Sequence, residues 1–127
     1  LFSGPLPLSI GKLTSLERLL LNENGISGAI PSEIGNASSL IFWSLDHNDV
    51  SGSIPLEVGK LSNLQSFELI ENSLTGSLPP ELSGLVNLEA LWLNMNELSG
   101  CLPPLGSLMK LDTLVLSENK LSCGIPE

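Results

Sequence analysis

Residues 61–79 read LSNLQSFELIENSLTGSLP, and residues 85–103 read LVNLEALWLNMNELSGCLP. Both stretches fit one template, LxxLxxLxLxxNxLxGxIP, in which apolar residues recur at fixed positions around one Asn and one Gly. The first copy begins at Leu61 and the second at Leu85, and every template position recurs with that same offset. A fixed period of this length is the sequence signature of a protein built from stacked repeats.

The same template fits the remainder of the chain. Its copies begin at Leu13, Ala37, Leu61, Leu85 and Leu108, the last one residue early, and Phe2, Gly4, Leu6 and Pro7 match the end of a further copy. We therefore expect one repeat domain over residues 1–127, made of about five 24-residue repeats and a partial N-terminal one. Stacked repeats need polar caps at their ends, and both ends of this chain fall inside a repeat. We expect the chain to be a fragment of a longer protein, without its caps.

The spacing within each copy predicts how the copies pack. In the LxL segment the two Leu side chains point one way and the residue between them points the other way. One copy cannot bury its apolar side alone, but stacked copies bury it against each other. The pattern predicts an α/β repeat solenoid whose LxL segments form a parallel sheet, with neighbouring strands about 4.8 Å apart.

The Asn that follows each LxL segment lies at a bend of the predicted coil. Its amide can satisfy backbone groups that the bend leaves without partners, which gives these residues a structural role. We expect them to be buried in one row along the stack. They are Asn24, Asn48, Asn72, Asn96 and Asn119.

Composition excludes several classes of function. A formal net charge of −9 argues against nucleic acid or an anionic lipid surface as a partner. No apolar run approaches the length that spans a membrane, so we expect no membrane contact within this chain. The acidic charge favours a basic partner. The alternative is that the charge only keeps the protein soluble.

The residues after each repeat Asn carry a family resemblance. They read ISGAIP at 26–31, VSGSIP at 50–55 and LTGSLP at 74–79. This element resembles the plant-specific class of leucine-rich repeats, known from receptor-like kinase ectodomains, receptor-like proteins and polygalacturonase-inhibiting proteins. The resemblance implies a right-handed superhelix with a parallel sheet on the concave face and short 3-10 helices or loops on the convex side. It also implies a second short strand on the flank of each coil.

The resemblance implies a protein- or peptide-binding module rather than a particular ligand. The first hypothesis is that the chain is part of an extracellular receptor-like ectodomain that recognises a ligand or co-receptor on its concave face. The signal peptide and any membrane span would then lie outside this chain. One alternative is a secreted inhibitor of a microbial cell-wall hydrolase. Another is a structural or scaffolding repeat in an extracellular assembly, which would make its contacts on the flank or the convex side.

Candidate ligand-binding residues follow from the predicted sheet. Exposed positions lie before, between and just after the strand leucines, and they combine large apolar side chains with carboxylates, which is typical of a binding surface. The excess of acids predicts a protein or peptide ligand with basic and apolar groups. The candidates are Arg18, Leu20, Glu23, Phe42, Asp46, His47, Glu68, Ile70, Glu71, Trp92, Met95 and Glu118. Trp43 takes a strand-leucine position and is expected in the core instead.

The sequence offers no catalytic or metal-binding arrangement. Carboxylates such as Glu68 and Glu71 are available, but an open sheet gives little desolvation to raise a carboxylate pKa towards neutrality. No motif places a nucleophile beside a base, and no phosphate-binding loop is present. His47 is the only histidine, and its neighbours Asp46 and Asp49 make a poor metal site. We expect no enzymatic activity, no metal and no cofactor.

Two further features point to an oxidising, secretory setting. Cys101 and Cys123 lie at nearly equivalent places on neighbouring coils, within reach of a disulfide bond. However, Cys123 takes the repeat Gly place and Cys101 follows it, so in an extended strand the two would face opposite sides, and the pairing stays open. Asn36-Ala37-Ser38 is the only N-glycosylation sequon, and it falls on the convex connection, away from the sheet.

Overall fold

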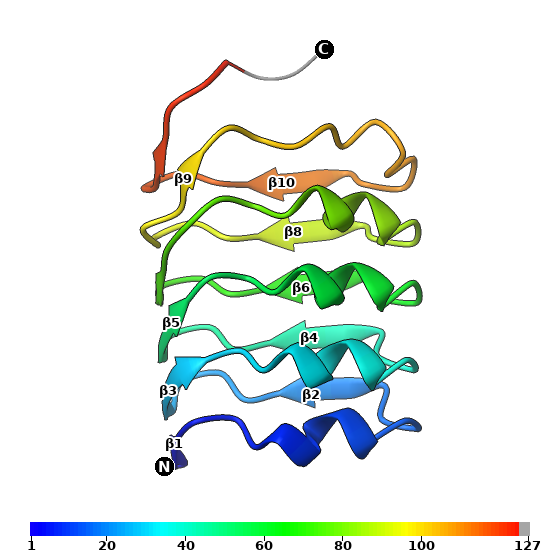
Figure 1. The fold of residues 1–127 in the computed structure, drawn as a ribbon, viewed down its shortest axis with the longest axis vertical. Coiled ribbons are helices and arrows are strands. Elements are labelled where there is room, and N and C mark those ends of the chain that lie inside the picture. Colours follow the sequence, from blue (N-terminus) through cyan, green and yellow to red (C-terminus); the bar gives the residue numbers. More distant parts are fainter. Residues whose placement is uncertain (125–127) are drawn as a thin grey trace.

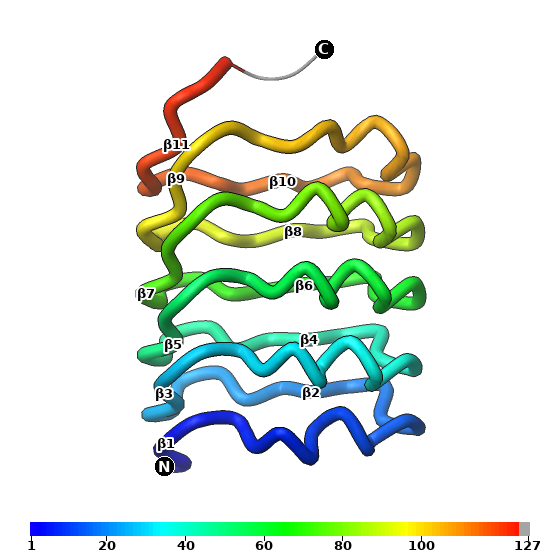
Figure 2. The backbone as a smooth tube through the Cα atoms, in the orientation of Figure 1, coloured from blue at the N-terminus to red at the C-terminus, as the bar shows by residue number. Residues whose placement is uncertain are grey.

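The computed structural model describes residues 1–124 as a stack of coils, with the N-terminus at one end and the last coil at the other (Figure 2). Each coil contains one strand of a long parallel sheet. Figure 1 shows these strands on one side of the stack and the helices on the other. The expected α/β solenoid of leucine-rich repeats is therefore confirmed.

The larger sheet has five parallel strands in the order β10-β8-β6-β4-β2. The strands are β2 (Arg18–Leu20), β4 (Phe42–Ser44), β6 (Ser66–Glu68), β8 (Ala90–Trp92) and β10 (Thr113–Val115). The central residue of each strand is an apolar member of the template, and these residues are aligned across the sheet, as Trp43 pairs with Phe67 and Phe67 with Leu91. Successive side chains alternate between the two faces, so the first and third residues of each strand point outward.

The LSGxIP elements form the second set of strands that the resemblance implied. They build one four-stranded and one two-stranded parallel sheet. Their strands are β1 (Ser3–Gly4), β3 (Gly25–Ala29), β5 (Asp49–Gly52) and β7 (Ser73–Leu74), followed by β9 (Ser99–Gly100) and β11 (Lys120–Leu121). Pairing here is staggered. Phe42 of the large sheet lies opposite Ser66, one full repeat later, whereas Ser27 lies opposite Asp49, which falls short of a full repeat.

Four 3-10 helices line the other side of the described coils. They are η1 (Leu8–Lys12), η2 (Ser32–Asn36), η3 (Leu56–Lys60) and η4 (Pro80–Gly84). Each follows a proline in extended conformation, such as Pro55, whose carbonyl accepts the N–H of Val58 and closes the first turn. A Cβ atom on Gly59 would overlap the backbone carbonyl oxygen of Glu81, so glycine is what lets η3 and η4 approach closely.

The coil between β9 and β10 is described in full and has no 3-10 helix. Its sequence explains the difference. Leu108 follows Pro103 by five positions, whereas Leu85 follows Pro79 by six. The early start of the last repeat thus removes a residue from the segment that forms a helical turn in the preceding coils.

The template leucines fill a continuous core between the two sides of the stack. Trp43 is buried, as expected for a residue in a strand-leucine position, and its ring stacks on Phe67 with the centroids 4.7 Å apart. Burial of these large side chains supplies the main driving force for stacking, since apolar burial stabilises by about 25 cal/mol per Å².

The repeat asparagines bond neighbouring coils to each other. The Nδ2 group of Asn72 donates to the carbonyl oxygens of Leu69 and Ile70 in its own coil and of Leu45 in the preceding coil, at 3.3, 3.3 and 3.0 Å. Its Oδ1 atom accepts the N–H of Val50 at 2.9 Å. The other four repeat asparagines make the same kind of contacts.

Burial along this row is uneven, contrary to the expectation that all five asparagines would be buried. Asn48 and Asn96 are buried, whereas Asn24, Asn72 and Asn119 are half-buried. Asn24 and Asn119 follow β2 and β10, which are the two edge strands of the larger sheet. All five repeat asparagines nevertheless form side-chain hydrogen bonds to the backbone. What the five share is therefore their hydrogen-bond partners and not complete burial.

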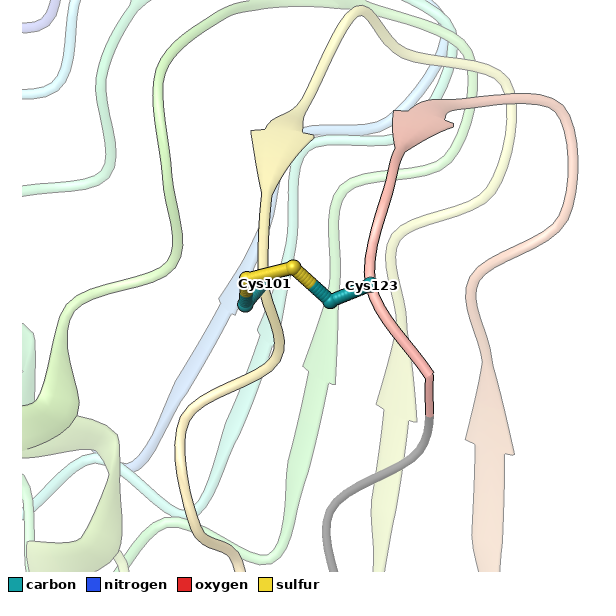
Figure 3. Close-up of a disulfide and its surroundings, with 2 residues drawn as sticks. All are labelled: Cys101 and Cys123. Carbon is teal, nitrogen blue, oxygen red and sulfur yellow. A yellow bond between two sulfur atoms is a disulfide. The ribbon is translucent and has the colours of Figure 1, made fainter.

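Cys101 and Cys123 form a disulfide bond, with their Cα atoms 4.9 Å apart (Figure 3). The alternation that would have put them on opposite sides does not apply, because Gly100 has a φ of +74° and the chain leaves the extended conformation directly before Cys101. The staggered pairing of β9 with β11 sets Gly100 opposite Leu121. The bond therefore joins two residues that follow β9 and β11 and lie nearly opposite each other.

Replacing Asn72 by Ala should lower the free energy of unfolding by about 1–3 kcal/mol, because it leaves the N–H of Val50 without a partner and removes one of the donors to three carbonyl groups. Urea unfolding followed by circular dichroism measures the loss. Asn22→Ala is the matched control, since Asn22 is exposed and its side chain makes no hydrogen bond within residues 1–124. Equal stabilities for the two variants would contradict a structural role for the asparagine row.

Removing the disulfide by Cys101→Ser together with Cys123→Ser should cost about 3 kcal/mol, the loop entropy expected for a cross-link between residues 22 apart. Mass mapping without reductant should recover one peptide pair joined through both cysteines. Adding a reductant to the parent should reproduce the stability of the double variant. Two free thiols in protein prepared without reductant would show that the bond is absent in solution.

Candidate ligand-binding surface

The outward face of the five-stranded sheet, here called the sheet face, brings most of the candidate residues onto one surface. Parallel pairing aligns the first residues of the strands in one row and the third residues in a second row. The first row is Arg18, Phe42, Ser66, Ala90 and Thr113. The second row is Leu20, Ser44, Glu68, Trp92 and Val115. Residues that follow the strands add two more rows at the same edge. The third row is Asn22, Asp46, Ile70, Asn94 and Ser117, and the fourth row consists of the residues directly after these.

Apolar side chains on the sheet face are less exposed than the sequence suggested. Met95 is exposed and so is Leu20, but Phe42, Ile70 and Trp92 are half-buried. The guanidinium of Arg18 lies 4.7 Å from the centroid of the Phe42 ring, in a cation–π contact that covers part of the ring. The expectation of exposure is therefore corrected for Phe42, Ile70 and Trp92, which lie partly against their neighbours, and it holds for Met95 and Leu20.

Ser44 departs further from the expected exposure. It belongs to the outward row, yet it is buried, with 4 % of its surface exposed. Its short side chain lies between Leu20 and Glu68 on the adjoining strands, and neither neighbour is as short. The second row therefore has a low point between its larger members.

Asp46 is the most constrained acid on the sheet face. Its Oδ1 atom accepts the N–H of Ile70 at 2.7 Å, which ties the carboxylate to the next coil. Burial raises the pKa of Asp46, and repulsion from Glu68 adds to the rise, while the hydrogen bonds from Ile70 and Ser44 and the nearness of His47 oppose it. Asp46 is thus a partly desolvated carboxylate, and the charged side chain that repels it from the adjoining coil is another acid, Glu68.

The fourth row consists of residues in the left-handed region of backbone conformation. These are Glu23, His47, Glu71, Met95 and Glu118, with φ values of 56°, 54°, 53°, 60° and 56°. Non-glycine residues adopt this region at a cost, so each coil accepts strain at the turn that precedes its repeat asparagine. The sequence analysis did not predict this strain. The signal available was position, because each strained residue directly precedes a repeat asparagine.

Within the fourth row, Nδ1 of His47 lies 2.7 Å from Oε2 of Glu71. Both side chains are about half exposed, so the pair contributes little to stability. Glu23, Met95 and Glu118 make no side-chain hydrogen bond to another candidate within residues 1–124. Glu68 accepts the hydroxyl of Ser66 at 2.7 Å and is held on the sheet by it.

A groove of about 400 Å³ runs along the edge where the strands begin, and its lining is Glu17, Ser39, Ile41, Asn63, Gln65 and Asn87. Sequence reasoning missed this groove, because its residues are not template positions. Among residues 1–124 no group of three His, Cys, Asp or Glu side chains is placed to hold a metal ion, and no helix has the length and apolar character of a membrane span.

The raised pKa of Asp46 predicts a dependence of stability on pH. A carboxyl whose pKa is higher in the folded state than in the unfolded state contributes stability below its unfolded pKa, and that contribution is lost as the pH rises through the folded pKa. Asp46→Asn keeps an oxygen for the N–H of Ile70 and removes the charge. It should be more stable than the parent at pH 7 and equal to it near pH 3.

Urea unfolding at both pH values tests this expectation. Asp49→Asn is the control, since Asp49 is exposed and carries the same charge. A difference between Asp46→Asn and the parent that is the same at both pH values would rule out ionisation of Asp46 as its cause.

Comparison with known proteins identifies the repeats. The family model described as Leucine Rich Repeat matches residues 15–37 and 63–85. A search of curated proteins gives no match. Solved structures give several, including the plant peptide hormone receptor RGFR1 in complex with RGF2, with 38% identity and a TM-score of 0.91 over 94% of this chain.

Two similar structures come from Arabidopsis. The receptor kinase HAESA, in complex with the peptide hormone IDA and the co-receptor SERK1, shows 37% identity and a TM-score of 0.91 over 96% of this chain. The ectodomain of the receptor kinase SOBIR1 shows 34% identity and a TM-score of 0.87 over 94% of it. The chain spans 19% of RGFR1, 20% of HAESA and 65% of SOBIR1.

The agreement with these receptors extends over nearly the whole chain, and it includes both the large sheet and the LSGxIP elements. The chain belongs to the plant-type leucine-rich repeat proteins.

Proposed function

We propose that this chain is a ligand-recognition segment of an extracellular receptor ectodomain, and that its sheet face binds an extended peptide or protein segment. The observation that carries the proposal is the alignment of Trp92 directly beside Glu68 in one outward row, with Asp46 and Ile70 in the row that follows. An aromatic side chain next to carboxylates offers a ligand both an apolar contact and a charged one. The receptors RGFR1 and HAESA, which the chain resembles, are complexed with peptide hormones.

Charge on the sheet face favours a ligand with basic groups. Glu23, Asp46, Glu68, Glu71 and Glu118 lie on it, against one arginine. That arginine, Arg18, is already placed over Phe42. A cationic side chain near Asp46 would also relieve the repulsion between Asp46 and Glu68 that contributes to the raised pKa.

Trp92 is the proposed main anchor. It is half-buried on the sheet, so its position is held by neighbours while part of the ring stays available. Such pre-positioned aromatic residues lose little freedom on binding, and they are enriched among the residues that contribute most to affinity. Met95 and Ile70, on the coils that contain Trp92 and Glu68, would extend the apolar contact.

The proposed activity is binding rather than catalysis. The carboxylates of the sheet face lie on an open surface, and the one histidine is paired with Glu71 at a half-exposed site. A location outside the cell is supported by the disulfide between Cys101 and Cys123, which is typical of oxidising compartments, and by the similarity to receptor ectodomains.

Screening the chain against a library of randomised eight-residue peptides tests this proposal. Enriched peptides should combine Lys or Arg with at least one large apolar residue. Against such a peptide, Trp92→Ala should weaken binding by about 30-fold, the equivalent of about 2 kcal/mol. Glu68→Lys with Glu71→Lys should mainly slow association and reduce its dependence on salt.

The matched control is Glu57→Lys with Glu81→Lys, which changes the net charge equally on helices η3 and η4. All variants are first checked for native circular dichroism and unfolding. If the sheet-face variants bind like the parent and the helix variants do not, the contact lies on the helical side. That outcome would favour the structural or scaffolding function instead.

A further inference from the structure

The groove at the edge of the sheet, here called the edge groove, is a polar site that the proposed function does not use. Its lining comes from four successive coils in two rows with the spacing of the repeat. One row is Ser39, Asn63 and Asn87, and the other is Glu17, Ile41 and Gln65. Its volume of about 400 Å³ lies within the range of small-ligand sites.

Some of these polar groups are already bonded to the protein. The Ser39 hydroxyl donates to the carbonyl of Thr14 at 2.6 Å, and Nδ2 of Asn63 donates to the carbonyl of Ser38 at 3.0 Å. The amide of Asn87 is bonded on both sides, to the carbonyl of Ser62 and to Nζ of Lys110.

Two other polar side chains of the edge groove have unused hydrogen-bonding capacity. The carboxylate of Glu17 and the amide of Gln65 make no side-chain hydrogen bond within residues 1–124. Gln65 is half-buried, which limits its access to water. The edge groove therefore offers an amide and a carboxylate, with one apolar wall at Ile41, to a ligand that both donates and accepts hydrogen bonds.

A glycosylation sequon lies beside the edge groove. Asn36, the last residue of η2, is exposed and makes no side-chain hydrogen bond in the described chain. Ala37 is fully buried and anchors the sequon to the core, and Ser38 is exposed. Ser39 follows directly, so the groove begins three residues from Asn36, a distance of at most about 11 Å along the chain.

We propose that Asn36 carries an N-linked glycan and that its first sugars lie in the edge groove. In the attachment step, the Asn36 amide nitrogen forms a bond to the anomeric carbon of a lipid-linked oligosaccharide. The bond between that carbon and the diphosphate oxygen breaks, and the lipid diphosphate leaves while the amide loses one proton. No oxidation or reduction is involved.

The chemistry of the first sugar matches the lining of the groove. N-acetylglucosamine carries an amide and several hydroxyl groups, so it can accept from the Gln65 amide and donate to the Glu17 carboxylate. Such contacts are weak for a free sugar in water. Attachment at Asn36 holds the sugar at a high effective concentration, so contacts form that a free saccharide would not make at ordinary concentrations.

This inference goes beyond the proposed function, and it requires only passage through the secretory pathway. A glycan at this edge would cover the side of the stack where the strands begin. The sheet face and the turns at the other ends of the strands would stay open to a ligand.

The test is a comparison of four forms of the chain secreted from eukaryotic cells with an added leader peptide. They are the parent, Ser38→Ala, Glu17→Ala with Gln65→Ala, and the triple combination. Intact mass should show a glycan on the parent and on the groove double variant, and none on the two forms with Ser38→Ala. Ser38→Ala keeps the backbone carbonyl that Asn63 uses, so it removes the glycan alone.

Thermal unfolding then separates attachment from contact with the groove. The glycosylated parent should unfold about 2–4 °C above Ser38→Ala, and in the groove background this difference should fall by at least half. Gln65→Glu replaces the double variant if that variant does not fold.

A parent mass equal to that of the bare polypeptide overturns the inference. So does a glycan whose effect on the unfolding temperature is absent, or is the same with and without Glu17 and Gln65. Because the leader is supplied and no ligand is present, these outcomes are independent of whether the sheet face binds a peptide.

Discussion

Hydrogen bonds between the repeat asparagines and the backbone of the neighbouring coil are the constraint on which the rest of the structure depends. A coil that turns after a short strand leaves carbonyl and N–H groups that it cannot satisfy itself. Asn48 satisfies such groups in two coils at once, because its Nδ2 atom donates to Leu21 and Leu45 and its Oδ1 atom accepts from Ile26. The leucine core gives the driving force for stacking, and the asparagines give it a fixed register.

The same register organises the sheet face. Since each strand lies opposite the next at a spacing of one full repeat, substitutions at the variable positions of the template appear side by side on one surface. Trp92 thereby comes to lie beside Glu68, although the two are far apart in the sequence. The repeated fold is thus a scaffold on which a binding surface is composed one residue per coil. The strain at residues such as Glu71 and Met95 is a cost of turning sharply enough to present that surface.

Local departures from the template have structural consequences of their own. One residue fewer before Leu108 removes a helical turn from that coil, and Gly100 turns the chain so that Cys101 meets Cys123. On the opposite edge, the sequon at Asn36 stands beside polar groups that do not belong to the template. Variation is therefore concentrated at the edges of the stack and on the sheet face, while the core and the asparagine row repeat.

The sequence by itself determined the parallel sheet and the burial of Trp43, because both follow from a period and an alternation that are local to one repeat. The second set of strands was implied by the family resemblance of the LSGxIP elements. The sequence also placed the candidate residues in their rows. Only the tertiary structure decided how far each side chain is exposed, since exposure depends on neighbours that belong to other repeats. Ser44 is buried because Leu20 and Glu68 flank it, and Phe42 is half-buried beside Arg18. The sequence also left the pairing of Cys101 with Cys123 open, and it did not reveal the edge groove, because both depend on how several coils stack.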